Sequence, residues 1–131
     1  MENFFEVIFL EDVIDFLRDM DNKHSTKIIY NIRKAQTQHD PELFKKLNDD
    51  IWEFRTLYQG IQYRLLAFWD KSDNQNTLVI STHGFMKKRS KVPDNEIQKA
   101  QQIKLDYFIE KEEIKEIANK ALKQTHKSPK K

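Results

Sequence analysis

A chain of 131 residues, of which 38% are hydrophobic and 34% charged, has the length of one domain and the composition of a folded, well-solvated one. The absence of cysteine excludes disulfides, thiolate metal ligands and a cysteine nucleophile. No apolar run approaches the roughly 18 residues of a membrane span, and the acidic N-terminus lacks the basic start of a signal peptide. We therefore expect a cytoplasmic protein that makes no contact with a membrane.

The net charge of +2 is unevenly distributed along the chain. Residues 1–21 hold seven acids against one arginine, whereas residues 83–93 hold four cations and no acid. A local basic stretch on a nearly neutral domain favours contact with a polyanion, and the alternative is a loop that only faces water.

The first half of the chain predicts one strand followed by helices. Residues 4–10 are apolar and rich in strand formers, and residues 11–20 carry apolar side chains at helical spacing. A second helix is expected to begin at Ser25 or Thr26. The sequence DPE at 40–42 predicts the start of a third, short helix.

Three strands are predicted in the middle of the chain, at residues 51–57, 63–70 and 77–87. The polar residues 71–76 are expected to form a hairpin loop between the last two of them. Strands in series with short connections indicate an antiparallel meander.

The C-terminal part is predicted to be helical. After Pro93, apolar residues recur at helical spacing, which indicates one helix or a helical pair with an extension over residues 109–124. Residues 125–131 are expected to be a disordered basic tail, so that residues 1–124 form one domain. Helices packed on an antiparallel meander define a small α+β fold, with the N-terminal strand and helices against the sheet.

Alternation along the strands predicts which side chains share a face of the sheet. Trp52 and Phe54 should face the helices, which places Arg55 on the opposite, open face. In the third strand, the same alternation groups Val79 and Ser81 with His83. One assignment brings five residues together on the open face: Arg55, Arg64, His83, Phe85 and Lys87.

These side chains suit an RNA phosphate site. Arginine binds phosphate with two parallel hydrogen bonds, lysine adds a point charge, Phe85 could stack on a base, and His83 could move a proton. Structural alternatives stay open at each position. Arg55 could pair with Glu53 or a helix acid, His83 could be a structural hydrogen-bonding group, Phe85 could belong to the core, and Gly84 could mark a bulge.

No metal or nucleotide-cofactor site is predicted. The adjacent Asp49 and Asp50 have the character of a turn, and the four histidines show no ligand spacing. With only two glycines, the chain has no phosphate-binding glycine loop. A nuclease built from these residues would work without metal or cofactor.

Several short motifs occur in a fixed order in the second half of the chain: IWEFR at 51–55, YR at 63–64, HGFMKK at 83–88 and VPDNEIQKA at 92–100. Together they resemble the RelE/ParE toxin superfamily, and within it the phage-derived, HigB-like branch. The resemblance covers residues 3–108.

This resemblance implies the toxin of a type II toxin–antitoxin pair. Such toxins are typically ribosome-dependent mRNA interferases, in which an RNA 2′-OH attacks the adjacent phosphate without metal. It implies catalytic roles for Arg55, Arg64, His83 and Lys87. RNA-binding roles are implied for Lys45, Lys46, Phe85, Lys88, Arg89 and Lys91. The implied partners are mRNA, the ribosome and an antitoxin, expected to be a small helix-turn-helix protein.

Two other functions fit the same fold. One is a ParE-type inhibitor that binds DNA gyrase and cleaves nothing, and the other is an inactive phage-derived binding module. The RNA hypothesis requires the cations to converge on one solvent-facing surface and to stay free of internal ion pairs.

Overall fold

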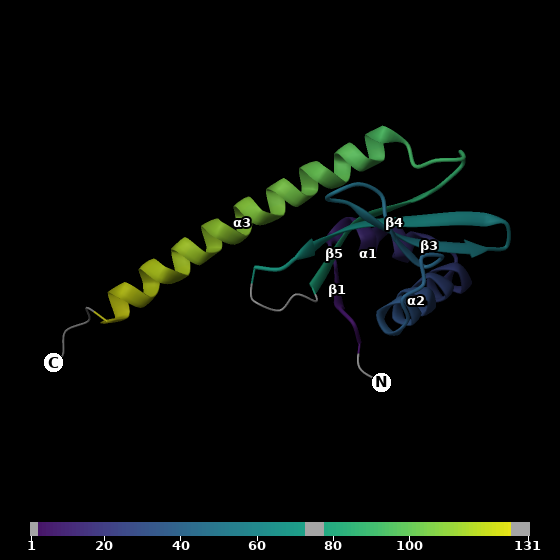
Figure 1. Ribbon diagram of the computed structural model, residues 1–131. Helices are drawn as coiled ribbons and strands as arrows, with labels where there is room; N and C mark the ends of the chain where they lie inside the picture. Colours follow the sequence, from purple (N-terminus) through teal and green to yellow (C-terminus); the bar gives the residue numbers. More distant parts are fainter. Residues whose placement is uncertain (1–2, 73–77, 127–131) are drawn as a thin grey trace.

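The computed structural model describes residues 3–72 and 78–126, which form a mixed α+β fold (Figure 1). Its elements, in chain order, are β1 (Glu6–Phe9), α1 (Glu11–Asp19), α2 (Asn22–Thr37), β2 (Phe44–Lys46), β3 (Trp52–Tyr58), β4 (Ile61–Asp70), β5 (Leu78–Met86) and α3 (Asp94–His126). The sheet order is β1-β5-β4-β3-β2. Strands β3 to β5 pair antiparallel, as predicted, β2 pairs antiparallel with β3, and β1 pairs parallel with β5. The predicted loop 71–76 lies mostly outside the described residues, as do residues 127–131 of the predicted tail.

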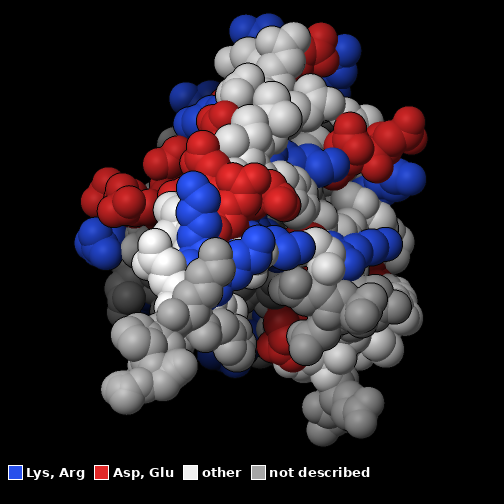
Figure 2. All heavy atoms as spheres, turned by 90° about the vertical axis from the view of Figure 1, so that its left-hand side faces the viewer, with Lys and Arg blue, Asp and Glu red and all other residues white. Residues whose placement is uncertain are grey.

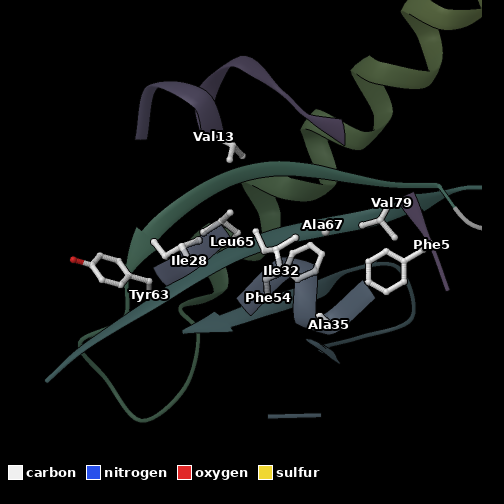
Figure 3. Close-up of a cluster of buried hydrophobic side chains, with 10 residues drawn as sticks. All are labelled: Phe5, Val13, Ile28, Ile32, Ala35, Phe54, Tyr63, Leu65, Ala67 and Val79. Atoms are coloured by element: carbon white, nitrogen blue, oxygen red, sulfur yellow. The ribbon is translucent and has the colours of Figure 1, made fainter. Parts of the chain in front are cut away.

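The larger core lies between the sheet and the two N-terminal helices. Figure 3 shows side chains of the sheet, including Phe54 and Leu65, meeting Ile28 and Ile32 of α2. The strands turn alternate residues toward this core, because successive side chains point to opposite faces of a sheet. The prediction that Trp52 and Phe54 face the helices is confirmed, since both lie on this side.

A second core forms on the opposite face, under the first half of α3. Leu66 and Phe68 of β4 pack there against Ala100, and all three are fully buried. This half of α3 is also fixed by polar contacts, because Tyr107 Oη donates to Asp70 Oδ2 at 2.6 Å and Lys111 Nζ donates to the same oxygen at 2.7 Å. The second half of α3 extends past the sheet (Figure 1). Of the two predicted alternatives, one helix or a helical pair, the structure has one continuous helix.

The predicted short helix after residue 40 is wrong, because this segment forms a turn and then the edge strand β2. Asp40 makes the hydrogen bond expected of a helix cap, since its Oδ1 accepts from the backbone N of Glu42 at 2.9 Å. The residues after it nevertheless form a turn instead of a helix. Phe44 then stacks on Trp52 and Phe54 of β3 at centroid distances of 4.9 and 4.3 Å. Burial of these aromatic faces outweighs the local helix signal.

The start of α2 also differs from the prediction. The helix begins at Asn22, and its cap is Asp21, whose Oδ1 accepts from the backbone N of Lys23 at 2.8 Å. Ser25 and Thr26 therefore lie inside the first turns of the helix rather than at its cap.

A bulge in β5 changes which residues share a face. Leu66 pairs with His83 and Ala67 with Ser81, so Thr82 is an extra residue. Before the bulge, Val79 faces the α1–α2 core, and after it His83 faces α3. The predicted grouping of Val79 and Ser81 with His83 is wrong for this reason.

Gly84 lies beyond the bulge and makes room for α1. A Cβ atom at this position would lie 2.5 Å from Cδ2 of Phe16. The close approach of Phe16 therefore explains why a glycine stands at position 84. The bulge that Gly84 was expected to mark lies two residues earlier, at Thr82.

We expect Gly84→Ala to lower the free energy of unfolding by about 1–3 kcal/mol, because the added methyl group forces Phe16 or the strand to move. Urea denaturation measures the change. In a Phe16→Leu background the same substitution should cost less, because the smaller side chain yields space. An equal cost in both backgrounds would mean that Phe16 is not the obstacle.

Candidate functional site

Strand register brings the predicted basic residues to one face of the sheet. Arg55 lies opposite Arg64, which lies opposite Phe85, so the three form a row across β3, β4 and β5. Lys87 comes directly after β5, and its backbone N donates to the carbonyl of Gln62 at 2.7 Å. This part of the predicted grouping is confirmed.

A neighbouring row places one carboxylate among these cations. Lys45 of β2 lies opposite Glu53 of β3, which lies opposite Leu66. Glu53 Oε1 is 3.2 Å from Arg64 Nε, and Glu53 Oε2 is 3.7 Å from Arg55 Nε. One carboxylate is thus shared by two arginines.

Arg64 does not lie on an open surface, which corrects the prediction. Its side chain is 3% exposed, and its guanidinium also donates to the carbonyl of Tyr63 at 3.0 Å and to Gln62 Oε1 at 2.9 Å. Burial lowers the pKa of Arg64, and the Glu53 carboxylate opposes that effect. The cations share one face, but the required freedom from internal ion pairs is not met for Arg64 or for Arg55, since both pair with Glu53.

The other cations remain closer to solvent. The Arg55 side chain is 25% exposed, Lys87 is half-buried and Lys45 is exposed. Partial burial and the charge of Arg64 lower the pKa of Lys87. We call Lys45, Arg55, Arg64 and Lys87, with Glu53 among them, the cation cluster. It carries four positive charges and one negative charge, with Glu42 as a further acid near Arg64.

Residues 15–104, more than half of the chain, match the family model of phage-derived Gp49-like proteins (DUF891). The chain belongs to this family. Gp49-like proteins are of the RelE toxin-like kind, so the expected superfamily is confirmed at that level, and a toxin-like family implies an antitoxin partner. No curated protein matches the sequence. The matched residues include the whole cation cluster and end within α3.

His83 of this Gp49-like protein is a buried hydrogen-bonding residue. It is 2% exposed, its Nε2 lies 2.9 Å from Glu96 Oε1 of α3, and its Nδ1 lies 2.9 Å from Thr82 Oγ1. Burial lowers the pKa of His83 in spite of the Glu96 hydrogen bond. The structural alternative is therefore confirmed, and the geometry does not present this ring to a substrate.

The other predicted RNA-binding residues are dispersed around the Gp49-like fold. Phe85 is half-buried, packs in the core under α3 and lies 5.9 Å from the His83 ring, so only part of it is available to a base. Lys46 lies opposite Trp52 and hence on the other face from Lys45. Three exposed cations occupy the loop between β5 and α3: Lys88, Arg89 and Lys91.

Glu53 pairs with Arg55, as one structural alternative allowed, but its contact with Arg64 was missed. Its alternation with Arg55 in WEFR placed it on the correct face, but its part in holding both arginines depends on the cross-strand position of Arg64. In the described ranges 3–72 and 78–126, no three histidines or acids lie where they could hold a metal ion together. A separate finding is that no helix in these ranges is long and apolar enough to cross a membrane.

Proposed function

We propose that this Gp49-like protein is a HigB-like type II toxin that cleaves mRNA at the ribosome. The observation that carries the proposal is the cation cluster, in which three strands of one sheet and the residue that follows β5 supply positive groups to the same face. RNA chemistry of this kind requires positive charge that is fixed in advance where negative charge develops on phosphorus.

In the proposed reaction, the 2′-oxygen forms a bond to the adjacent phosphorus while the bond from phosphorus to the 5′-oxygen breaks. The products are a 2′,3′-cyclic phosphate and a free 5′-OH. The proton leaves the 2′-OH to water, and the 5′-oxygen gains one from Lys87, whose lowered pKa makes its ammonium a better acid.

The members of the cation cluster have different roles in this proposal. Arg55, Lys45 and Lys87 contact the phosphates, because they reach solvent. Arg64 is a positioning residue. It binds Glu53, and Glu53 in turn keeps the Arg55 side chain in place. The exposed loop cations Lys88 and Arg89 add contacts to the mRNA or ribosomal backbone.

The test is to induce the protein in cells and map the 5′ ends of mRNA. We expect cuts phased with codons, and Lys87→Ala should lower their frequency about 100-fold or more, as when one charge-stabilising donor is removed. Lys34→Ala is the matched control, because Lys34 is an exposed lysine on α2. Absence of new 5′ ends with the parent protein would contradict RNA cleavage.

A ParE-type gyrase inhibitor is the second candidate, because the burial of His83 removes the proton carrier expected of a nuclease. The same induction distinguishes the two. Double-strand DNA breaks with intact mRNA would favour gyrase, whereas codon-phased cuts with intact DNA would favour the interferase.

A further inference from the structure

We propose that the projecting half of α3 is a self-association surface, through which two copies of the chain pair in antiparallel orientation. The relevant segment is residues 112–126, which we call the overhang. It lies beyond Lys111, which is tied to Asp70, and beyond the part of the chain that matches the Gp49-like family. The proposal does not depend on the RNA activity.

The apolar stripe that faces the sheet continues into the overhang. Ala100, Tyr107 and Ile114 are seven residues apart and so lie on one face of the helix. Ala100 and Tyr107 pack against the sheet, but Ile114 is 59% exposed, and on the same side Ile117 is 68% exposed. The overhang therefore exposes apolar side chains of the kind that pack on the sheet in the first half of α3, at a place where no sheet lies beneath the helix (Figure 1).

A packed partner would stabilise the overhang. Every residue from 112 to 124 is exposed. Helices of this length are marginal in water on their own, since most helical stability in proteins comes from packing an apolar face. An apolar stripe rimmed by charges is the signature of an interaction surface.

The charge distribution identifies a second copy as that partner. Residues 110–116 hold four glutamates against two lysines, a net of −2, and one of those lysines, Lys111, is bound to Asp70. Residues 117–126 hold Lys120 and Lys123 and no acid, a net of +2. An antiparallel pair places the acidic part of each helix against the basic part of the other, whereas a parallel pair opposes like charges.

One alignment of the two antiparallel helices brings their apolar stripes together and also places opposite charges next to each other. With the two-fold axis close to Ile117, the two Ile117 side chains meet, and Glu113 of one copy faces Lys120 of the other. Glu113 and Lys120 are seven residues apart, too far to pair within one helix. The two domains lie at opposite ends of the pair, because the overhang points away from the sheet. Figure 2 views the molecule from the side toward which α3 projects and shows acidic and basic groups next to one another on that side.

Sedimentation equilibrium of the full chain tests the proposal. We expect a reversible monomer–dimer equilibrium, and Ile117→Glu should weaken association at least 10-fold. Leu105→Glu is the matched control, because Leu105 is 55% exposed on the opposite side of the same helix, and it should leave the equilibrium unchanged. Glu113→Lys should weaken the dimer, and the charge swap Glu113→Lys with Lys120→Glu should restore it.

The absence of cysteine gives an independent readout. Ile117→Cys should form an intermolecular disulfide on mild oxidation, whereas Leu105→Cys should not, since bridged Cα atoms must lie within about 7 Å. A chain that stays monomeric at all concentrations, or that responds equally to Ile117→Glu and Leu105→Glu, would overturn the proposal. So would a monomer in which Ile117→Glu abolishes only binding of the antitoxin, because the occupant would then be a different protein.

Discussion

Arg64→Ala is expected to lower the free energy of unfolding by about 3 kcal/mol, although Arg64 belongs to the cluster that we assign to RNA. The substitution leaves the buried Glu53 carboxylate with only the longer contact to Arg55, at 3.7 Å. Removing one partner of a buried ion pair typically costs about 3–5 kcal/mol, because an uncompensated charge stays behind. Because Arg55 still contacts Glu53 in the variant, we expect a loss at the lower end of this range.

Urea denaturation of Arg64→Ala and Arg55→Ala separates the two roles. Arg55→Ala should cost about 1 kcal/mol or less, because its side chain reaches solvent and Arg64 still holds Glu53. Lost toxicity in Arg55→Ala then reports on RNA contact, whereas lost toxicity in Arg64→Ala also reflects folding. An Arg64→Ala variant as stable as the parent would show that the Glu53 pair contributes nothing to the fold.

Asp70→Asn is expected to have the second large effect on stability, about 3 kcal/mol at pH 7. Asp70 is 2% exposed and accepts hydrogen bonds from Ser72, Tyr107 and Lys111, so it joins the end of β4 to α3. Burial alone would raise the pKa of this carboxyl, but the hydrogen bonds from Lys111, Ser72 and Tyr107 outweigh burial and hold the pKa well below its usual range.

This shift fixes the sign of the pH dependence. Since the pKa is lower in the folded state, the Asp70 contribution is complete above the unfolded value of about 3.9 and is lost as the pH falls further. The stability difference between the parent and Asp70→Asn should thus be constant from about pH 7 to 5 and shrink below about pH 4. Asp106→Asn, an exposed change on the same helix, should stay within about 0.5 kcal/mol of the parent. A difference that grew toward acid pH would contradict the assignment.

The strands and the shared face of the basic residues could be predicted because both depend on local alternation. Alternation offered the shared face of Arg55 and Arg64 as one assignment, and the register of β3 with β4, in which the two residues lie opposite each other, selects it. The bulge at Thr82 could not be predicted, since it depends on the pairing of β5 with β4. That bulge also decides that His83 faces α3 and becomes buried against Glu96.

Burial was the property that the sequence could not supply. Alternation places Arg64 on a face, but only the assembled sheet shows that its side chain is enclosed and paired with Glu53. The edge strand β2 was missed for a related reason, because the stacking of Phe44 on Trp52 and Phe54 is a long-range contact that competes with a local turn signal.

The central claim is that the face carrying the cation cluster binds RNA phosphates, and adjacent lysines of β2 test it most directly. Lys45 and Lys46 are both exposed, but Lys45 pairs with Glu53 on the cluster face and Lys46 pairs with Trp52 on the other. The measurement is the affinity for a single-stranded 2′-O-methyl RNA, which cannot be cleaved by its own 2′-oxygen, over a range of salt concentrations. We expect Lys45→Ala to weaken binding and to reduce the salt slope by about 0.7, the value of one phosphate contact on a single strand, while Lys46→Ala leaves both unchanged. Equal effects of the two substitutions, or no effect of Lys45→Ala, would contradict the assignment of this face to RNA.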